Sequence, residues 1–406
     1  MATLKPFQPY RYTSKVGDPS HLLTQPYDKI NPAMQAKYLA ASPYNLVRVI
    51  LGERHSADNS SDNVYTRAAK HLDEWIRDGI LAQDPQPGFY AYFQDFAVPD
   101  TAERATRMGF IGLGKVEDYS AGVVYRHEQT LSGPKKDRLE LLRHTRGHFG
   151  QIFMLYPDRE GSVDQLLQTA TAASAPALDV LDEYQARHRL WPITDQATTR
   201  HMAALMSDKK LLIADGHHRY ETALAYRNEN PGVPAAEYVM MTFVNMYSPG
   251  LKILATHRVL RNLEGFQAAA LLAKARTSGW SVREGMPEQG PSGTVRIGLV
   301  AASRSYVLER ARREGELDVP VLHTEILGGL LGISEESVRD ERYITYVRGV
   351  NAAVAEVREK GAQAAFLLEP TPIDEMARIA FAGGVMPQKS TDFYPKLLSG
   401  VTIYRL

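Results

Sequence analysis

The sequence predicts a mixed α/β protein, an α+β chain with an α/β core. Segments with the alternation and β-branched content of strands are interleaved with segments of helical periodicity. Residues 121–250 follow the order strand, helix, strand, helix, which is typical of a compact α/β unit. At 406 residues the chain is longer than a single core usually grows, so we expect several folding units.

The first expected unit, 1–120, combines helical and extended signals. Asn31 followed by Pro32 predicts the start of a short helix, because proline fits a first turn whose backbone donor is unpaired anyway. The apolar run 46–51 predicts a strand, and an amphipathic helix is expected over 62–76. Two further strands, 89–96 and 107–114, form a hairpin or neighbouring pair.

The second expected unit, 121–250, contains most of the chemistry, and the third, 251–406, alternates strands and helices. In the second unit a strand runs to Glu128, a basic helix follows from Ser132, and strands at 151–156, 189–193 and 211–214 alternate with helices. The third unit ends in the polar segment MPQKSTDFYPKLLSG, which we expect to be a loop and a candidate lid. Its hydroxyls and cations, Lys396 among them, bind an anion or simply solvate the loop.

Composition excludes several classes of protein. Lys plus Arg and Asp plus Glu both number 47, so no net positive field favours nucleic acid or an anionic membrane. There is no cysteine, which removes thiol catalysis, thiolate metal sites and disulfides. No apolar segment reaches the ~18 residues of a spanning helix. We therefore expect a cytoplasmic protein with no nucleic-acid or membrane partner, and a homo-oligomer stays open.

The turn Asp215-Gly216-His217-His218-Arg219 is the strongest candidate site. A buried strand ends there and a helix begins, and first-turn amides of a helix have no internal partners and carry the positive end of its dipole. Gly216 permits close approach of a ligand, and Arg219 can make a bidentate contact with phosphate. The alternative is an ordinary capped helix with exposed basic residues.

Asp215 does not suit an anion site unless it binds a metal ion or a ligand hydroxyl, or caps the helix. The two histidines diverge by ~100° around the helix, which disfavours a shared zinc ion. Neither a GxxxxGK[ST] phosphate loop nor a GxGxxG dinucleotide motif occurs.

A second candidate lies at the end of the strand that precedes the basic helix. Glu128, beside His127, is placed to act as a general base toward a substrate hydroxyl. Lys136 and Arg138 on the helix could neutralise transferring phosphate charge. The alternative is a solvated amphipathic helix after a strand-end acid.

Four separated motifs, ADGHHRYETALAYR, HEQTLSGPKKDRLELLR, HRLWPITD and MPQKSTDFYPKLLSG, resemble the family known as domain of unknown function 1015. That family resembles the ParB-like superfamily, in which a strand-turn-helix with an arginine binds nucleotide phosphates. One branch consists of free-serine kinases, whose phosphate segment also contains Asp-Gly-His-His-Arg. The resemblance implies a ParB-like core between additional N- and C-terminal α+β units.

The resemblance implies a function as well. Gly216 to Arg219 would hold the phosphates of ATP or ADP with Mg²⁺, and Glu128, His127 and Asp215 would be catalytic. A small hydroxyl metabolite, L-serine by resemblance, would be the acceptor. A nucleotide-binding regulatory module and a metal-dependent hydrolase are the alternatives.

Overall fold

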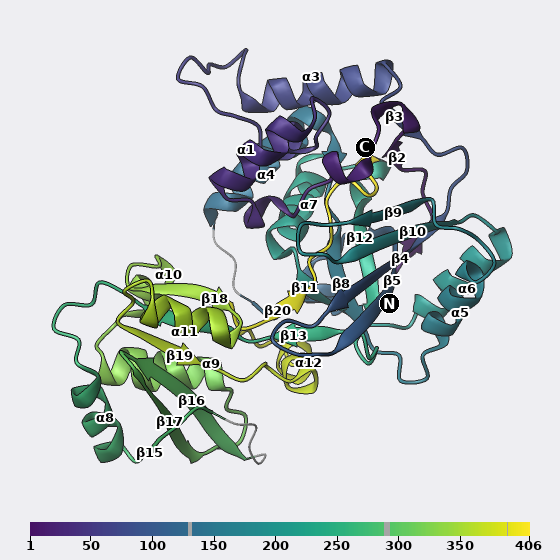
Figure 1. The fold of residues 1–406 in the computed structure, drawn as a ribbon. Helices are drawn as coiled ribbons and strands as arrows, with labels where there is room; N and C mark the ends of the chain where they lie inside the picture. Colours follow the sequence, from purple (N-terminus) through teal and green to yellow (C-terminus); the bar gives the residue numbers. More distant parts are fainter. Residues whose placement is uncertain (129–131, 288–292, 388) are drawn as a thin grey trace. The chain divides into compact units, whose positions relative to one another are not determined.

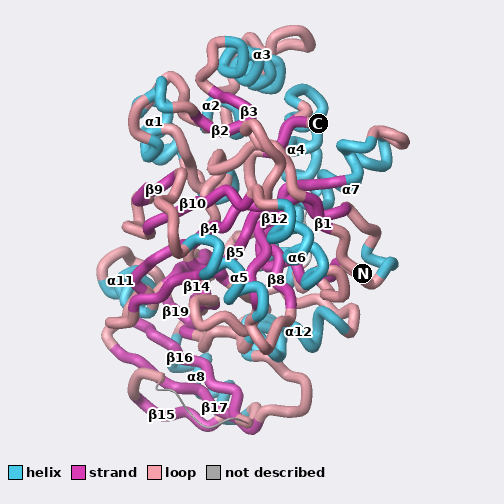
Figure 2. Tube along the Cα trace, turned by 90° about the vertical axis from the view of Figure 1, so that its right-hand side faces the viewer, coloured by secondary structure: helices cyan, strands magenta, loops and turns pink. Residues whose placement is uncertain are grey.

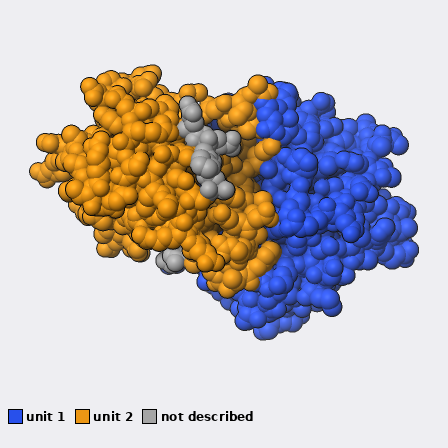
Figure 3. Space-filling model, turned by 90° about the horizontal axis from the view of Figure 1, so that it is seen from below, with its two compact units in different colours: residues 1–97, 103–251, 395–406 blue, residues 98–102, 252–394 orange. Residues whose placement is uncertain are grey.

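The computed structural model describes residues 1–128, 132–287, 293–387 and 389–406. The chain divides into two compact units (Figure 3). Unit 1 contains residues 1–97, 103–251 and 395–406, and unit 2 contains residues 98–102 and 252–394. Both units mix helices and strands, which confirms the predicted fold class (Figure 1).

Unit 1 is built on one large mixed sheet. Its strands follow the order β6-β11-β8-β12-β5-β4-β10-β9, and β1 pairs with β5. The pairs β6/β11 and β8/β12 are parallel and the other pairs are antiparallel. The strands are β1 (Leu4–Lys5), β4 (Phe89–Ala97), β5 (Arg104–Lys115), β6 (Val124–Tyr125), β8 (Ile152–Tyr156), β9 (Leu178–Leu181), β10 (Arg187–Ile193), β11 (Leu211–Asp215) and β12 (Tyr238–Asn245).

Helices and short strands of unit 1 surround this sheet, and Figure 2 shows α1, α2 and α3 gathered with β2 and β3. The small strands are β2 (Tyr10–Tyr12) with β3 (Leu81–Gln83), and β7 (Gly147–His148) with β21 (Tyr404–Arg405). The helices are α1 (Pro32–Ala41), α2 (Val47–Ile50), α3 (Val64–Arg77), α4 (Ser132–Thr145), α5 (Ser162–Thr171), α6 (Gln196–Met206) and α7 (His217–Glu229).

Local capping signals place the helix starts. The Asn31 side chain accepts a hydrogen bond of 2.9 Å from the Met34 amide, so the predicted start of α1 is confirmed. Asn63 and Thr66 form a reciprocal capping box at the start of α3.

The predicted strands 89–96 and 107–114 are confirmed as the antiparallel pair β4/β5.

The two faces of β4 have different partners, as the pleat of a strand requires. Phe89, Ala91 and Phe93 contribute to the main apolar core, which also takes in buried side chains of α5, α6 and α7. Tyr92 and Gln94 alternate with them and hydrogen-bond with the C-terminal segment instead. One face of β4 therefore packs in the helix-covered core, and the other face binds residues 395–406.

The predicted strand over 46–51 is wrong. Residues Val47–Ile50 form one helical turn, α2. Val47, Val49 and Ile50 are all buried, so no exposed side alternates with a buried one as a half-buried strand would require. The burial of Val47, Val49 and Ile50 overrides the β preference of the branched side chains.

Unit 1 extends across the boundary that we expected at residue 120. Strands β4 and β5 precede that position, and β12 and β10 follow it, yet all four belong to one sheet. The change of unit after residue 251 lies next to the expected boundary at 250. Residues 395–406, which we expected to belong to the third unit, return to unit 1.

Unit 2 has its own antiparallel sheet, in the order β15-β17-β16-β19-β14-β18. Its apolar core is separate from that of unit 1. The strands are β13 (Lys252–Leu254), β14 (Thr256–Leu260), β15 (Ser281–Glu284), β16 (Thr294–Ala301), β17 (Arg304–Ala311), β18 (Ile344–Arg348), β19 (Ala364–Leu367) and β20 (Asp392–Tyr394). The helices are α8 (Ala268–Thr277), α9 (Asp318–Val321), a π-helix (Leu322–Leu330), α10 (Glu335–Arg339), α11 (Val350–Arg358) and α12 (Ile373–Phe381).

The aromatic stack inside unit 1 predicts a large mutational effect. Phe110 is fully buried, with its ring centroid 5.0 Å from Phe243 and 5.5 Å from Phe89. We expect Phe110→Ala to lower the free energy of unfolding of unit 1 by about 3–5 kcal/mol. Urea denaturation followed by tryptophan fluorescence measures this. Leu181→Ala, at a side chain that is 51% exposed, is the control, and an equal loss in both variants would contradict the packing.

Candidate functional site

A left-handed glycine connects β11 to α7. Gly216 has φ of 94°, and the first helical hydrogen bond runs from the Tyr220 amide to the Gly216 carbonyl at 2.9 Å. The amides of residues 217–219 precede that bond, so they have no partner within the helix. A Cβ at Gly216 would lie 3.0 Å from Cζ and Nε of Arg219. A side chain here would therefore strain the backbone and displace the Arg219 guanidinium.

Asp215, at the end of β11, is paired with two cations. Its Oδ2 lies 3.0 Å from Lys396 Nζ, and its Oδ1 lies 3.5 Å from Arg219 Nη2. Burial alone raises the pKa of Asp215, but the charges of Lys396, Arg219 and Lys29 outweigh burial and lower the pKa well below its usual range. Asp215 is therefore a carboxylate under all ordinary conditions.

The turn carries a surplus of positive charge. Two cations, Lys396 and Arg219, share the single carboxylate of Asp215, which leaves a net charge of +1 for the three groups. Only 10% of the Lys396 side chain and 15% of the Arg219 side chain are exposed, so solvent screens them weakly. Arg219 Nη1 also donates to the Gln151 carbonyl, which fixes the guanidinium beside the turn.

Two buried histidines lie next to this turn. His127 Nδ1 donates to the Ile213 carbonyl at 2.7 Å, and the ring centroids of His127 and His217 are 4.8 Å apart. Burial lowers the pKa of His127 to about 4 and the pKa of His217 well below its ordinary value, so both rings are neutral at pH 7. Among the described residues, none is a hydrogen-bond partner for His217 Nε2, although His217 is only 7% exposed.

Strand register relates Glu128 to the turn. Strand β6 pairs in parallel with β11, with Val124 opposite Leu211 and Tyr125 opposite Leu212. Strand β6 ends at Tyr125, and a continuation of this register beyond that residue would bring Glu128 level with Asp215. The side chain of Glu128 is half-buried, as is that of His218.

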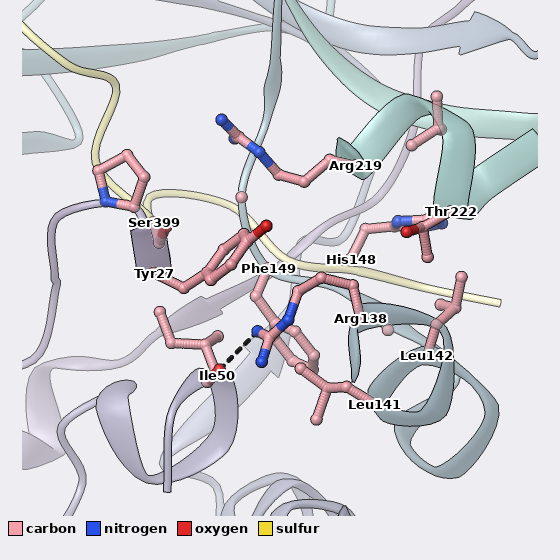
Figure 4. A pocket seen from close by; sticks show the side chains of 14 residues that line it. Tyr27, Ile50, Arg138, Leu141, Leu142, His148, Phe149, Arg219, Thr222 and Ser399 are labelled. Atoms are coloured by element: carbon pink, nitrogen blue, oxygen red, sulfur yellow. Dashed lines mark hydrogen bonds between the residues drawn. The ribbon is translucent and has the colours of Figure 1, made fainter. Parts of the chain in front are cut away.

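A cavity of about 60 Å³ lies beside Arg219 in unit 1 (Figure 4). Its wall comes from α4, α7, the segment around Tyr27, the glycine-containing stretch 147–150 and Ser399. Arg138 lines it, with Nη1 donating to the Ile50 carbonyl at 2.6 Å and the guanidinium carbon 4.2 Å from the centre of the Tyr27 ring. Lys136 is exposed on α4 and does not line this cavity.

Two residues at the site come from the C-terminal segment. Lys396 contacts Asp215, and Ser399 lines the cavity. The sequence offered Lys396 only as one cation of a polar tail, because no local pattern connects it with a turn that lies 181 residues earlier. Lys389, from the same tail, belongs to unit 2.

The described residues at the site offer few ligands for a metal ion. Among the described residues, no three His, Asp or Glu side chains form a group that could hold one. Both oxygens of Asp215 face cations, which compete with a divalent ion for the same carboxylate. Asp215, as it is paired here, does not fit the predicted role of a metal ligand.

The described helices include none that is both long and apolar enough to cross a membrane.

The fold and the site define a mixed α/β protein with a cationic strand-to-helix turn. The chain belongs to the family described as "Protein of unknown function (DUF1015)", whose model matches residues 4–326. This confirms the family that the four motifs predicted. Curated proteins yield no significant match.

Solved structures show a distant likeness. A conserved hypothetical protein from Pyrococcus furiosus is 12% identical, with a TM-score of 0.37, over 68% of this chain and 91% of that one. A free serine kinase in complex with ADP is 13% identical, with a TM-score of 0.37, over 67% and 84%. SbnI with a C-terminal truncation, from Staphylococcus aureus, is 10% identical, with a TM-score of 0.38, over 71% and 85%.

Gly216 and Gly161 provide a matched pair of substitutions. Both precede a helix of unit 1 with positive φ, 94° and 68°, but a Cβ at Gly161 would meet nothing within 4 Å. We expect Gly161→Ala to cost about 1 kcal/mol of stability from backbone strain alone. Gly216→Ala should cost more, because the Arg219 guanidinium must also move. Urea denaturation compares the two, and equal costs would contradict the contact with Arg219.

The lowered pKa of His127 predicts that the free energy of unfolding depends on pH. Its pKa is about 4 in the folded protein and ordinary in the unfolded chain, so the unfolded chain binds the proton first as pH falls. Its contribution to stability is full above pH ~6.5 and declines by roughly 3 kcal/mol on the way to pH ~4. We expect His127→Asn to flatten that part of the stability curve.

The exposed His55 provides the control for that measurement. His55→Asn should leave the acid dependence of the free energy of unfolding unchanged. If both variants gave the wild-type curve between pH 6.5 and 4, a neutral buried His127 would be ruled out.

Proposed function

We propose that this protein is a nucleotide-dependent phosphotransferase that acts on a small hydroxyl metabolite. The observation that supports it is the turn at Gly216, where first-turn amides of α7 meet two weakly screened cations that share one carboxylate. Amides at a helix N-terminus and an excess of positive charge both favour a bound anion. The buried Nε2 of His217, for which no described residue is a partner, adds a polar atom that a ligand could satisfy.

Phosphate is the anion that suits this arrangement best. It accepts several hydrogen bonds at once, which matches a row of amides and a guanidinium. In this proposal the amides of residues 217–219 and Arg219 hold the phosphates of ATP or ADP. A magnesium ion would be held chiefly by the phosphates themselves, since Asp215 is occupied by cations.

Glu128 is the proposed general base toward the acceptor hydroxyl. Its expected position level with Asp215 brings a half-buried carboxylate to the edge of the sheet at which the phosphates would bind. His127 is neutral and is held by the Ile213 carbonyl, so its proposed role is to maintain the position of the neighbouring Glu128. Asp215 would keep the cations of the turn in place.

The cavity beside Arg219 limits the size of the acceptor. A volume of about 60 Å³ has room for about four to six water-sized atoms, which is the scale of a small metabolite. L-Serine is the acceptor that the motif resemblance implies. Arg138 lines the same cavity and would interact with an anionic part of the ligand.

A nucleotide-binding regulatory module that turns over slowly or not at all would use the same turn, so only turnover separates it from the kinase. The metal-dependent hydrolase has the least support, because the described residues include no ligand set for its metal.

The kinase proposal predicts separable kinetic effects. We expect ADP or AMP formation from ATP or ADP to require an acceptor from a panel of small hydroxyl compounds that includes L-serine. Glu128→Gln should lower kcat by about 100- to 10,000-fold with little change in nucleotide Kd. Arg219→Ala should instead weaken nucleotide binding by about 10- to 100-fold. Coupled-enzyme assays and calorimetry measure the two effects.

Glu160→Gln, at an exposed acid of unit 1, is the matched control and should behave as the wild type. Tight nucleotide binding without acceptor-dependent turnover would favour the regulatory module. Turnover that survives both Glu128→Gln and Arg219→Ala would overturn the site.

A further inference from the structure

The C-terminal segment, residues 395–406, lies on unit 1 although 252–394 belong to unit 2. Its second residue, Lys396, has its Nζ 3.0 Å from Asp215 and a side chain that is only 10% exposed. A nearly buried ammonium at the start of α7 is a costly arrangement unless its charge is used or compensated. Asp215 pairs with this ammonium, and Arg219 pairs with the same carboxylate.

The backbone around Lys396 is fixed by three buried side chains of the sheet. Arg107 donates to the Pro395 carbonyl at 2.5 Å, and Gln94 Nε2 donates to the Lys396 carbonyl at 2.9 Å. The Leu398 amide donates to the Tyr92 hydroxyl at 3.3 Å. These side chains are connected with each other, because Arg107 Nε donates to Gln94 Oε1 at 3.0 Å. Consecutive peptide groups of the segment are thus held from one side.

Further anchors follow along the segment. Ser399 exchanges backbone hydrogen bonds with Thr24, and the Gly400 amide donates to the Phe149 carbonyl at 2.9 Å. Tyr404 pairs with His148 in the β7/β21 ladder. The segment therefore has a defined path past the cavity, and the side chain of Lys396 reaches Asp215 at the turn.

We propose that Lys396 is a ligand-contacting residue of the phosphate site, supplied by the C-terminal segment, and that Tyr92, Gln94 and Arg107 are its positioning residues. This inference rests on the proposed function. When an anionic phosphate binds at the α7 N-terminus, the Lys396 ammonium turns from the Asp215 carboxylate to a phosphate oxygen. Asp215 is in this view a competitor that holds the ammonium in place until the ligand arrives.

The exchange follows from charge and from side-chain flexibility. A lysine ammonium has three donors on a four-carbon chain, so it can change partners while its backbone stays fixed. A phosphate carries more negative charge than a carboxylate, and Lys396 is screened little by solvent. The positioning side chains bind the backbone of the segment.

Binding of ADP and of inorganic phosphate to the full chain, measured by calorimetry, tests the role of Lys396. We expect Lys396→Met to weaken ADP binding by about 10- to 100-fold and Lys396→Arg to retain most of it. Lys37→Met, at an exposed lysine of α1, is the matched control and should bind as the wild type. Lys396→Met binding equal to wild type would overturn the inference, whereas a wild-type protein that binds neither ligand would refute the proposed function itself.

The variant Asp215→Asn tests whether Asp215 competes with the ligand for Lys396 or helps to hold the ligand. If Asp215 competes for Lys396, the variant should bind inorganic phosphate several-fold more tightly than the wild type, with or without Mg²⁺. Weaker binding would mean that Asp215 helps to hold the ligand, and it would overturn the proposed exchange. Because this variant is expected to gain affinity, a loss of folding cannot imitate the result.

A double-mutant cycle tests the positioning role. Gln94→Leu should weaken ADP binding in the wild-type background and change it little in the Lys396→Met background, because Gln94 acts through Lys396. A purely structural role would lower affinity equally in both backgrounds, and that outcome would contradict the assignment. Thermal unfolding of each variant shows whether it is folded under the conditions of the titration.

Discussion

The ion pair between Asp215 and Lys396 connects two parts of the chain that are 181 residues apart. One partner ends a strand at the candidate site, and the other belongs to the segment that hydrogen-bonds with strand β4 of the same sheet. The pair therefore couples the geometry of the turn to the docking of the C-terminal residues. Cavity, turn and segment form one arrangement, since Ser399 of that segment also lines the cavity.

This arrangement depends on an unusual buried charge. Arg107 is 1% exposed, and burial lowers its pKa to about 9. Its guanidinium lies 4.6 Å from the centre of the Phe153 ring and donates to Gln94 and to the Pro395 carbonyl. A buried charge is tolerated when it is fully hydrogen-bonded, and loss of its partners is strongly destabilising. The docking of the segment thus contributes to the stability of the sheet as well as to the site.

Elements with a local signal were predictable from the sequence. Asn31 and Asn63 cap helices through side chains a few residues away, and the alternation in 89–96 specifies a strand whatever its partner. The turn at Gly216 was predictable for the same reason, because glycine between a strand and a helix is a local feature. The helical turn over Val47–Ile50 was missed because tertiary burial determines it.

The residues that contact the turn at Gly216 could not be predicted in the same way. Gln94 and Arg107 are polar residues in two strands of largely apolar sequence, and nothing near them indicates that they bind residues 395 and 396. Likewise, a lysine in a polar tail carries no information about a carboxylate in another segment. The family motifs contain Asp215 and Lys396 but neither Gln94 nor Arg107, and only the folded chain shows which of them touch.

The path of the chain has a consequence for its synthesis. Residues 252–394, nearly all of unit 2, are made after the large sheet of unit 1 and before residues 395–406. The Pro395 and Lys396 carbonyls that Arg107 and Gln94 bind are therefore translated only after unit 2. A nascent or prematurely terminated chain would have the turn at Gly216 but neither Lys396 nor Ser399. Completion of the site thus requires translation through residue 399.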